Sequence, residues 1–139
     1  MDLAAQIGAA RLAAPPAGFS EPDRLDWHTI ADRYRALLEL GDQHGVVPQL
    51  ELWGFARVLK KLSEVAYVAV ETGHPRACIL ADSYHLYKGG SNYESLRLIS
   101  GAGLGVFHIN DYPAEPERKE ITDAHRVFPG DGVAPLGTL

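Results

Sequence analysis

The sequence predicts an α/β protein with about four parallel strands and three intervening helices. Four apolar runs that are too short for helices recur along the 139 residues, at 9–14, 46–52, 77–82 and 104–109. Between them, apolar residues recur at three- and four-residue steps, which is the period of an amphipathic helix. Strands that alternate with helices pair in parallel through right-handed crossovers, so the two observations together predict consecutive βα units.

The last two apolar runs are predicted to be strands buried on both faces. Residues 77–80 and 104–109 are nearly continuously apolar, without the alternation of apolar and polar residues that a half-solvated strand has. Parallel strands that are covered by helices typically have this continuous pattern.

The three helices are predicted from their apolar periodicity and their end signals. The first follows Asp26, a favourable N-cap, and has Gly41 and Gly45 as its stops. The second carries one apolar stripe over residues 55–70. The third opens at residues 91–94, which read SNYE and have the spacing of a capping box.

The composition is that of one globular unit, and no charged macromolecular partner is indicated. Thirteen basic and eighteen acidic residues give a formal net charge of −5. Since no block of like charge stands out, we expect neither a nucleic-acid partner nor binding to an anionic membrane. No apolar run is long enough to cross a bilayer, and the N-terminus lacks the basic region of a signal peptide. The single cysteine, Cys78, cannot form an internal disulfide, which favours a cytoplasmic location.

Three of the predicted strands end in a residue that can bind a metal or transfer a proton, namely Glu51, Asp82 and His108. The C-terminal ends of parallel strands form the floor of the active site in α/β proteins. Carboxylate and imidazole ligands that converge there suit a divalent cation such as Mn²⁺, Mg²⁺ or Co²⁺, with Zn²⁺ less favoured. Each residue alone has a simpler interpretation, because strand-end acids often cap helices and histidines with apolar neighbours often form core hydrogen bonds.

Four motifs surround these residues and follow one another at βα spacing: PQLELWG at 48–54, DSYH at 82–85, HIND at 108–111 and RVFPGDG at 126–132. Together they resemble the sugar phosphate isomerase/epimerase superfamily, the xylose isomerase-like TIM barrels, over nearly the whole chain. The resemblance implies that residues 1–139 form a single partial (β/α)8 TIM-barrel domain containing strands four to seven of the full barrel.

The resemblance also implies roles for five residues. Glu51, Asp82 and His108 correspond to the family's metal ligands, and Glu51 also corresponds to a catalytic acid/base. His85 corresponds to the histidine that contacts a substrate oxygen, and Arg126 to the arginine that holds a substrate hydroxyl or phosphate. The family's fourth ligand is a glutamate on the eighth strand. That strand is expected beyond the end of this chain, so the activity is predicted for the complete barrel.

The expected reaction is isomerisation or epimerisation of a sugar, a sugar phosphate or an inositol derivative. A divalent metal would polarise the substrate oxygen and stabilise an enediolate while Glu51 transfers a proton at the neighbouring carbon. Two alternatives stay open. One is a zinc phosphodiesterase of the endonuclease IV kind, suggested by the D-x-H spacing of Asp123 and His125, and the other is a non-catalytic half-barrel. A half-barrel exposes strand edges, which predicts marginal stability or a homo-oligomer.

Two residues near the motifs have competing interpretations. Asp111 could orient the adjacent loop or a metal-bound imidazole, or could simply form a turn before Pro113. Arg126 could pair with Asp123 or Asp131 instead of contacting a substrate.

Overall fold

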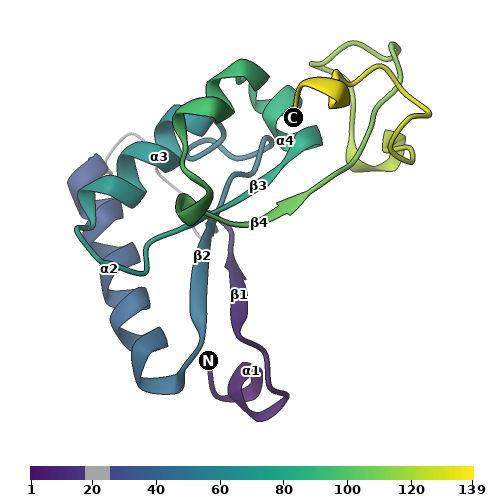
Figure 1. The fold of residues 1–139 in the computed structure, drawn as a ribbon. Coiled ribbons are helices and arrows are strands. Elements are labelled where there is room, and N and C mark those ends of the chain that lie inside the picture. The colour runs from purple at the N-terminus through teal and green to yellow at the C-terminus, as the bar shows by residue number, and fades with distance from the viewer. Residues whose placement is uncertain (18–25) are drawn as a thin grey trace.

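The computed structural model describes residues 1–17 and 26–139, and it places the four predicted strands in one sheet. The strands are β1 (Arg11–Ala14), β2 (Val47–Glu51), β3 (Ile79–Asp82) and β4 (Leu104–His108), in that order across the sheet. Every neighbouring pair is parallel. The predicted α/β class with four parallel strands is therefore confirmed (Figure 1).

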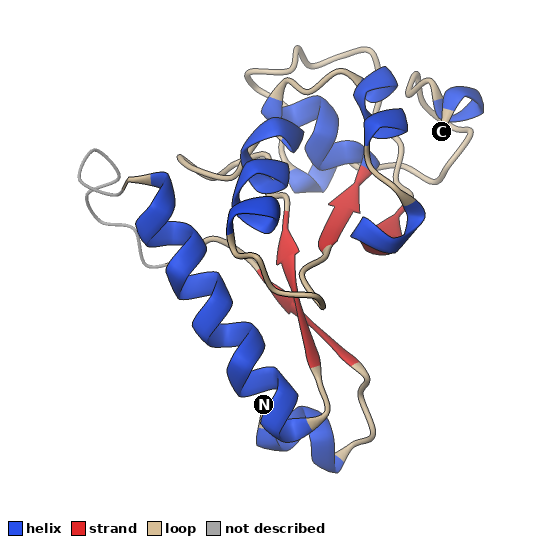
Figure 2. Cartoon of the chain, turned by 60° about the vertical axis from the view of Figure 1, so that its left-hand side comes forward, coloured by secondary structure: helices blue, strands red, loops and turns tan. Residues whose placement is uncertain are grey.

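Helical segments connect each strand to the next, as the sequence predicts. They are α2 (Trp27–His44), α3 (Leu62–Glu71) and α4 (Ser83–Gly89), the last followed by the 3-10 segments η2 (Tyr93–Leu98) and η3 (Gly101–Gly103). The short helix α1 (Asp2–Gln6) precedes β1, and the 3-10 segments η4 (Asp123–His125) and η5 (Leu136–Thr138) follow β4. The long α2 and the shorter α3 pack against each other along one side of the sheet, as Figures 1 and 2 both show. Within residues 1–17 and 26–139, no helix has the length and apolar character needed to cross a bilayer.

The main core lies between the sheet and these two helices. Its buried side chains come from α2 (Ile30, Ala31, Tyr34, Leu38), α3 (Leu62, Val65, Val68), β2 and the residue after it (Leu50, Leu52) and β3 (Ile79, Ala81). Successive side chains of a strand point to opposite faces of the sheet. Glu51 and Asp82, which alternate with these core residues, therefore project from the face away from the helices.

The hydroxyl of Tyr34 joins β2 to β3 from within this core. It lies 2.8 Å from the Cys78 carbonyl and 3.0 Å from the Pro48 carbonyl, and it accepts the Cys78 N–H at 3.2 Å. Pro48 has no N–H to donate to a neighbouring strand. The Tyr34 hydroxyl thus supplies hydrogen bonds to both strands at the point where the β2–β3 ladder begins.

The first helix runs past the glycine that the sequence analysis named as a stop. Asp26 accepts the Thr29 N–H at 2.7 Å, which confirms the predicted N-cap, and Gly45 ends the helix with a φ of 68°. Gly41 lies inside the helix, and a Cβ atom there would collide with the Val46 carbonyl and the Pro48 ring. Gly41 is therefore a site of close packing between α2 and the start of β2.

The second helix starts later than predicted. The apolar stripe begins at Phe55, but α3 begins at Leu62 because residues 55–61 form an irregular connection. Leu59 is buried with a φ of 61°, outside the helical region. Glu64 caps the helix by accepting the N–H groups of Lys60 and Lys61 at 2.9 and 3.2 Å.

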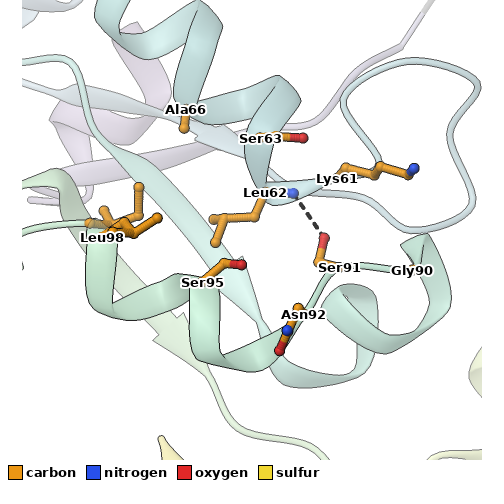
Figure 3. A pocket seen from close by; sticks show the side chains of 10 residues that line it. Lys61, Leu62, Ser63, Ala66, Gly90, Ser91, Asn92, Ser95 and Leu98 are labelled. Carbon is orange, nitrogen blue, oxygen red and sulfur yellow. Dashed lines mark hydrogen bonds between the residues drawn. The ribbon is translucent and has the colours of Figure 1, made fainter.

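The third predicted helix was wrong in type, and a short helix before it was not predicted. The chain enters α4 directly after β3, whereas the segment after Ser91 forms the 3-10 turn η2. The Ser91 hydroxyl accepts the Leu62 N–H at 2.9 Å and so caps α3 from outside, as Figure 3 shows. Ser91 therefore caps α3, while Asn92 caps η2 locally by accepting the Glu94 N–H at 3.0 Å.

Candidate functional site

The three predicted ligands end three adjacent strands at one edge of the sheet. Asp82 and His108 are paired in the β3–β4 register, and His108 Nδ1 lies 3.8 Å from Asp82 Oδ2. Glu51 ends β2 and is half-buried. Burial raises the pKa of Glu51, and the nearby His108 and Arg126 oppose this while Asp82 adds to it. The charges of Asp82, His108 and Arg126 therefore all act on the Glu51 carboxyl.

Asp82 is buried and fully engaged in hydrogen bonds. Its Oδ1 atom accepts the His85 N–H at 3.1 Å and thereby caps α4. Its Oδ2 atom accepts from Asn110 Nδ2 at 2.8 Å and from Arg126 Nη1 at 3.0 Å. Since the side chain is only 4% exposed, these donors replace the water that a carboxylate otherwise needs.

Arg126 is brought to the same place by the long loop after β4. Its Nε and Nη2 atoms donate to Asp123 Oδ1 at 2.9 and 2.7 Å, while Nη1 donates to Asp82. Its guanidinium carbon lies 4.3 Å from the centre of the Tyr84 ring. Of the two ion pairs that the sequence analysis considered, the one with Asp123 is present, and Asp82 is a second carboxylate partner that it did not name.

His85 completes the cluster from the first turn of α4. Its Nε2 atom lies 3.1 Å from Arg126 Nη2, and because a guanidinium can only donate, this nitrogen acts as the acceptor. Burial lowers the pKa of His85, an effect that Asp82 opposes and Arg126 reinforces. The Nδ1 atom is buried without a hydrogen-bond partner in the described part of the chain. Because Nε2 is the acceptor, the neutral ring carries its proton on Nδ1, which is therefore a buried donor.

The chain matches a known family along its whole length. The family described as xylose isomerase-like TIM barrel matches residues 1–139. The chain belongs to this family. Inosose isomerase of Bacillus subtilis (strain 168) is 33% identical to it over 101 residues, which are 72% of this chain and 36% of that protein.

Solved structures agree with the family assignment. The structure of the IolI protein with a bound zinc atom superposes with a TM-score of 0.84 at 23% identity, covering 97% of this chain and 49% of that one. A xylose isomerase domain protein from Alicyclobacillus acidocaldarius subsp. acidocaldarius gives 0.74 at 28% identity, with coverage of 98% and 51%. The chain thus spans about half the length of these barrels, and the predicted partial TIM barrel is confirmed. Its assignment to strands four to seven stays a prediction.

This member of the xylose isomerase-like family has two polar contacts at the strand ends that its sequence did not predict. Asn110 donates to Asp82, and its backbone N–H donates to the Ser83 hydroxyl at 2.7 Å. Both Ser83 and Asn110 lie within two residues of a predicted ligand. This position just beyond a strand end is the signal that could have identified them, because parallel strands end side by side.

The D-x-H spacing of Asp123 and His125 has a local structural cause. Both residues belong to the 3-10 turn η4, where His125 Nδ1 accepts the Thr122 N–H at 3.0 Å. Asp123 is turned toward Arg126. The two side chains therefore have structural partners that account for their spacing without a zinc pair.

The strand-end residues supply the donor types that a divalent cation needs, two carboxylates and one imidazole. In the part of the chain that the structure describes, no three His, Cys, Asp or Glu side chains lie in an arrangement that could hold an ion. Asp82 instead contacts the positive charge of Arg126. The pocket in Figure 3, between α3 and η2, is lined by none of the predicted site residues.

Proposed function

We propose that this chain supplies active-site residues to a metal-dependent isomerase or epimerase that acts on an uncharged keto sugar or keto inositol. The observation that carries the proposal is the position of Glu51, Asp82 and His108 at the C-terminal ends of three adjacent parallel strands. The likeness to inosose isomerase supports the reaction class. Because the chain covers 49% of the IolI barrel, the activity is proposed for a complete barrel that contains these residues.

Glu51, Asp82 and His108 are the residues that would hold the cation. Their donors suit Mn²⁺, Mg²⁺ or Co²⁺, and the zinc atom of the IolI structure adds Zn²⁺ to the ions to be tested. When bound, the cation would polarise a substrate oxygen and stabilise the negative charge that develops there. It would also compete with Arg126 for Asp82, so we expect the Arg126–Asp82 contact to change when the metal binds.

Glu51 is proposed as the group that transfers the proton. Isomerisation or epimerisation breaks a C–H bond beside a carbonyl, so that the proton passes to the carboxylate and the electron pair remains in an enediolate. Return of a proton to a carbon of the enediolate then gives the product. Glu51 suits this role because it projects from the face of the sheet away from the helices, at the same edge as Asp82 and His108.

The charge balance around Arg126 favours an uncharged substrate over a phosphate. Asp123 pairs with the guanidinium and His85 takes a further N–H, and neither contact involves Asp82, for which the cation would compete. A phosphate would have to displace the Asp123 carboxylate in a partly buried site, where unpaired charges are costly. We therefore narrow the expected ligand of Arg126 from a hydroxyl or phosphate to a hydroxyl or keto oxygen.

Replacement of Glu51 by glutamine tests the proposed chemistry. In the complete barrel supplied with Mn²⁺, the parent protein should incorporate deuterium from D₂O into an inosose, a keto inositol. Glu51→Gln should abolish this exchange and leave the circular dichroism spectrum intact. The matched control is Glu120→Gln, which makes the same change at an exposed position and should exchange like the parent. Undiminished exchange in Glu51→Gln would remove Glu51 from the mechanism.

A metal count in the same preparations separates the alternatives. One bound ion per chain supports the isomerase, whereas three zinc ions would support a phosphodiesterase of the endonuclease IV kind. Exchange by the complete barrel, together with no exchange by a polypeptide of these 139 residues with any of the four metals, would support a non-catalytic half-barrel.

A further inference from the structure

Asp111 is a buried carboxylate whose hydrogen-bond donors, among residues 1–17 and 26–139, are backbone N–H groups of its own loop. The residue is 1% exposed and lies three positions beyond His108. Its Oδ1 atom accepts the N–H groups of Tyr112 and Ala134, each at 2.8 Å. Its Oδ2 atom accepts those of Gly130 and Gly132, at 3.0 and 3.2 Å. Four backbone donors thus converge on one carboxylate, an arrangement that proteins also use to bind external anions.

The two glycines of the PGDG sequence have separate reasons for being glycine. Gly130 has a φ of 98°, a backbone conformation that residues with a side chain rarely adopt. At Gly132, a Cβ atom would collide with Asp111 Oδ1 and with the Tyr112 carbonyl. Both glycines therefore allow the loop backbone to close around the Asp111 carboxylate.

The same loop carries Arg126 to the candidate site. Asp111 and Val127 form an antiparallel bridge in which each N–H donates to the other's carbonyl, at 3.2 and 3.0 Å. Val127 directly follows Arg126, and Asp111 directly follows Asn110, which donates to Asp82. The end of β4 and the Arg126 segment are therefore joined at one residue, through its backbone and its side chain.

We propose that Asp111 is a positioning residue that sets the Arg126 guanidinium against Asp82 and His85. The importance of this placement for a substrate rests on the proposed function, but the placement itself does not require turnover. Asp111 thus acts through Arg126 and has no direct part in proton transfer. The PGDG loop is the backbone structure that holds its carboxylate.

The Arg126 Nε–H resonance in nuclear magnetic resonance spectra of the complete barrel provides a test that does not depend on activity. Asp111→Asn keeps the side-chain size but turns an NH₂ group toward two backbone donors. Gly132→Ala keeps Asp111 and instead pushes the loop away from it. The matched controls are Asp131→Asn, an exposed residue of the same loop, and Gly137→Ala, where a Cβ atom meets nothing within 4 Å.

We expect both test variants to shift the Arg126 Nε–H resonance and to speed its hydrogen exchange by at least about tenfold, with both controls like the parent. An unchanged Arg126 resonance, alongside faster exchange of the Gly130 and Gly132 amides, would overturn the inference, because Asp111 would then only stabilise its loop. Loss of the cooperative fold in both test variants would also overturn it, since Asp111 and the PGDG loop would then be needed for folding itself. Absence of isomerase activity in the parent would contradict the proposed function and leave this result unaffected.

Discussion

Asp82 serves both the fold and the candidate site. Its Oδ1 atom caps α4 through the His85 N–H, and its Oδ2 atom holds Asn110 and Arg126. From the sequence alone, a helix cap and a metal ligand are competing interpretations of a strand-end acid. The cap is confirmed, and it orients the carboxylate that would bind a cation, so the two roles are compatible.

The predicted ligands could be located in the sequence because each one lies at the end of an apolar run or one residue before it. The partners of Arg126 and Asp111 could not be read in the same way. Arg126 reaches Asp82 across 44 residues and Asp111 reaches Ala134 across 23, so both contacts depend on how a long irregular loop closes. The spacing of residues along the sequence does not predict how this loop closes. Gly130 and Gly132, which permit the closure, are the one signal that the sequence contains.

Acid titration should reveal the contribution of Asp111 to stability. Burial by itself would raise the pKa of Asp111, but its four backbone donors lower it below the ordinary value of 3.8. A group whose pKa is lower in the folded state stabilises the fold fully above its ordinary pKa, and this stability is lost as the pH falls through the lowered value. Urea unfolding between about pH 6 and about pH 2 should therefore show an acid loss of stability that Asp111→Asn lacks in part.

Asp131→Asn is the control for this titration, because it removes one exposed carboxylate from the same loop. It should keep the acid dependence of the parent protein. The same pH profile in Asp111→Asn and in the parent would show that the backbone donors do not favour the ionised carboxylate.

At the scale of elements, the sequence predicted strands better than helix ends. The continuous apolar run of β3 is explained by its burial at every residue. The prediction that β4 is buried on both faces was wrong, because β4 ends the sheet in the described part of the chain and is half-buried, with His108 exposed. The start of α3 was misplaced because the apolar pattern continues through the connection at 55–61, where Leu59 is buried without being helical. The helix α4 was missed because its seven residues are too few for a periodic pattern to stand out.

The connection between β2 and β3 depends on the Tyr34 hydroxyl, which a single substitution can test. Tyr34→Phe leaves the ring in the core but removes the hydrogen bonds to the backbone of Pro48 and Cys78. We expect the free energy of unfolding to fall by about 1–3 kcal/mol, because buried backbone groups lose their partner. Chemical denaturation provides the measurement.

Tyr67→Phe is the matched control for this substitution, since Tyr67 is 42% exposed on α3. Its effect should stay within about 0.5 kcal/mol, as is usual for surface changes. Equal stability losses in the two variants would mean that the Tyr34 hydroxyl does not hold the strands together.

At the scale of the whole molecule, the chain forms an open sheet that corresponds to about half of a barrel. The strands β1 and β4 end the sheet and have no further strand partner among the described residues. A closed barrel has no such edges. We therefore expect a polypeptide of these 139 residues alone to self-associate or to unfold with low cooperativity, as judged by sedimentation and calorimetry. A strictly monomeric species with a sharp cooperative transition would contradict this expectation.

The strand-end residues form the proposed cation site, and Mn²⁺ binding by the complete barrel tests this claim most directly. Calorimetric titration of the parent protein should give one ion per chain, and His108→Gln and Glu51→Gln should each weaken binding by at least about tenfold. His108 is well suited to this test because its side chain is 51% exposed and its replacement should disturb the fold little. Glu120→Gln should bind like the parent. Unchanged affinity in His108→Gln and Glu51→Gln, or a parent protein that binds no Mn²⁺, would contradict the claim that these three side chains hold one cation.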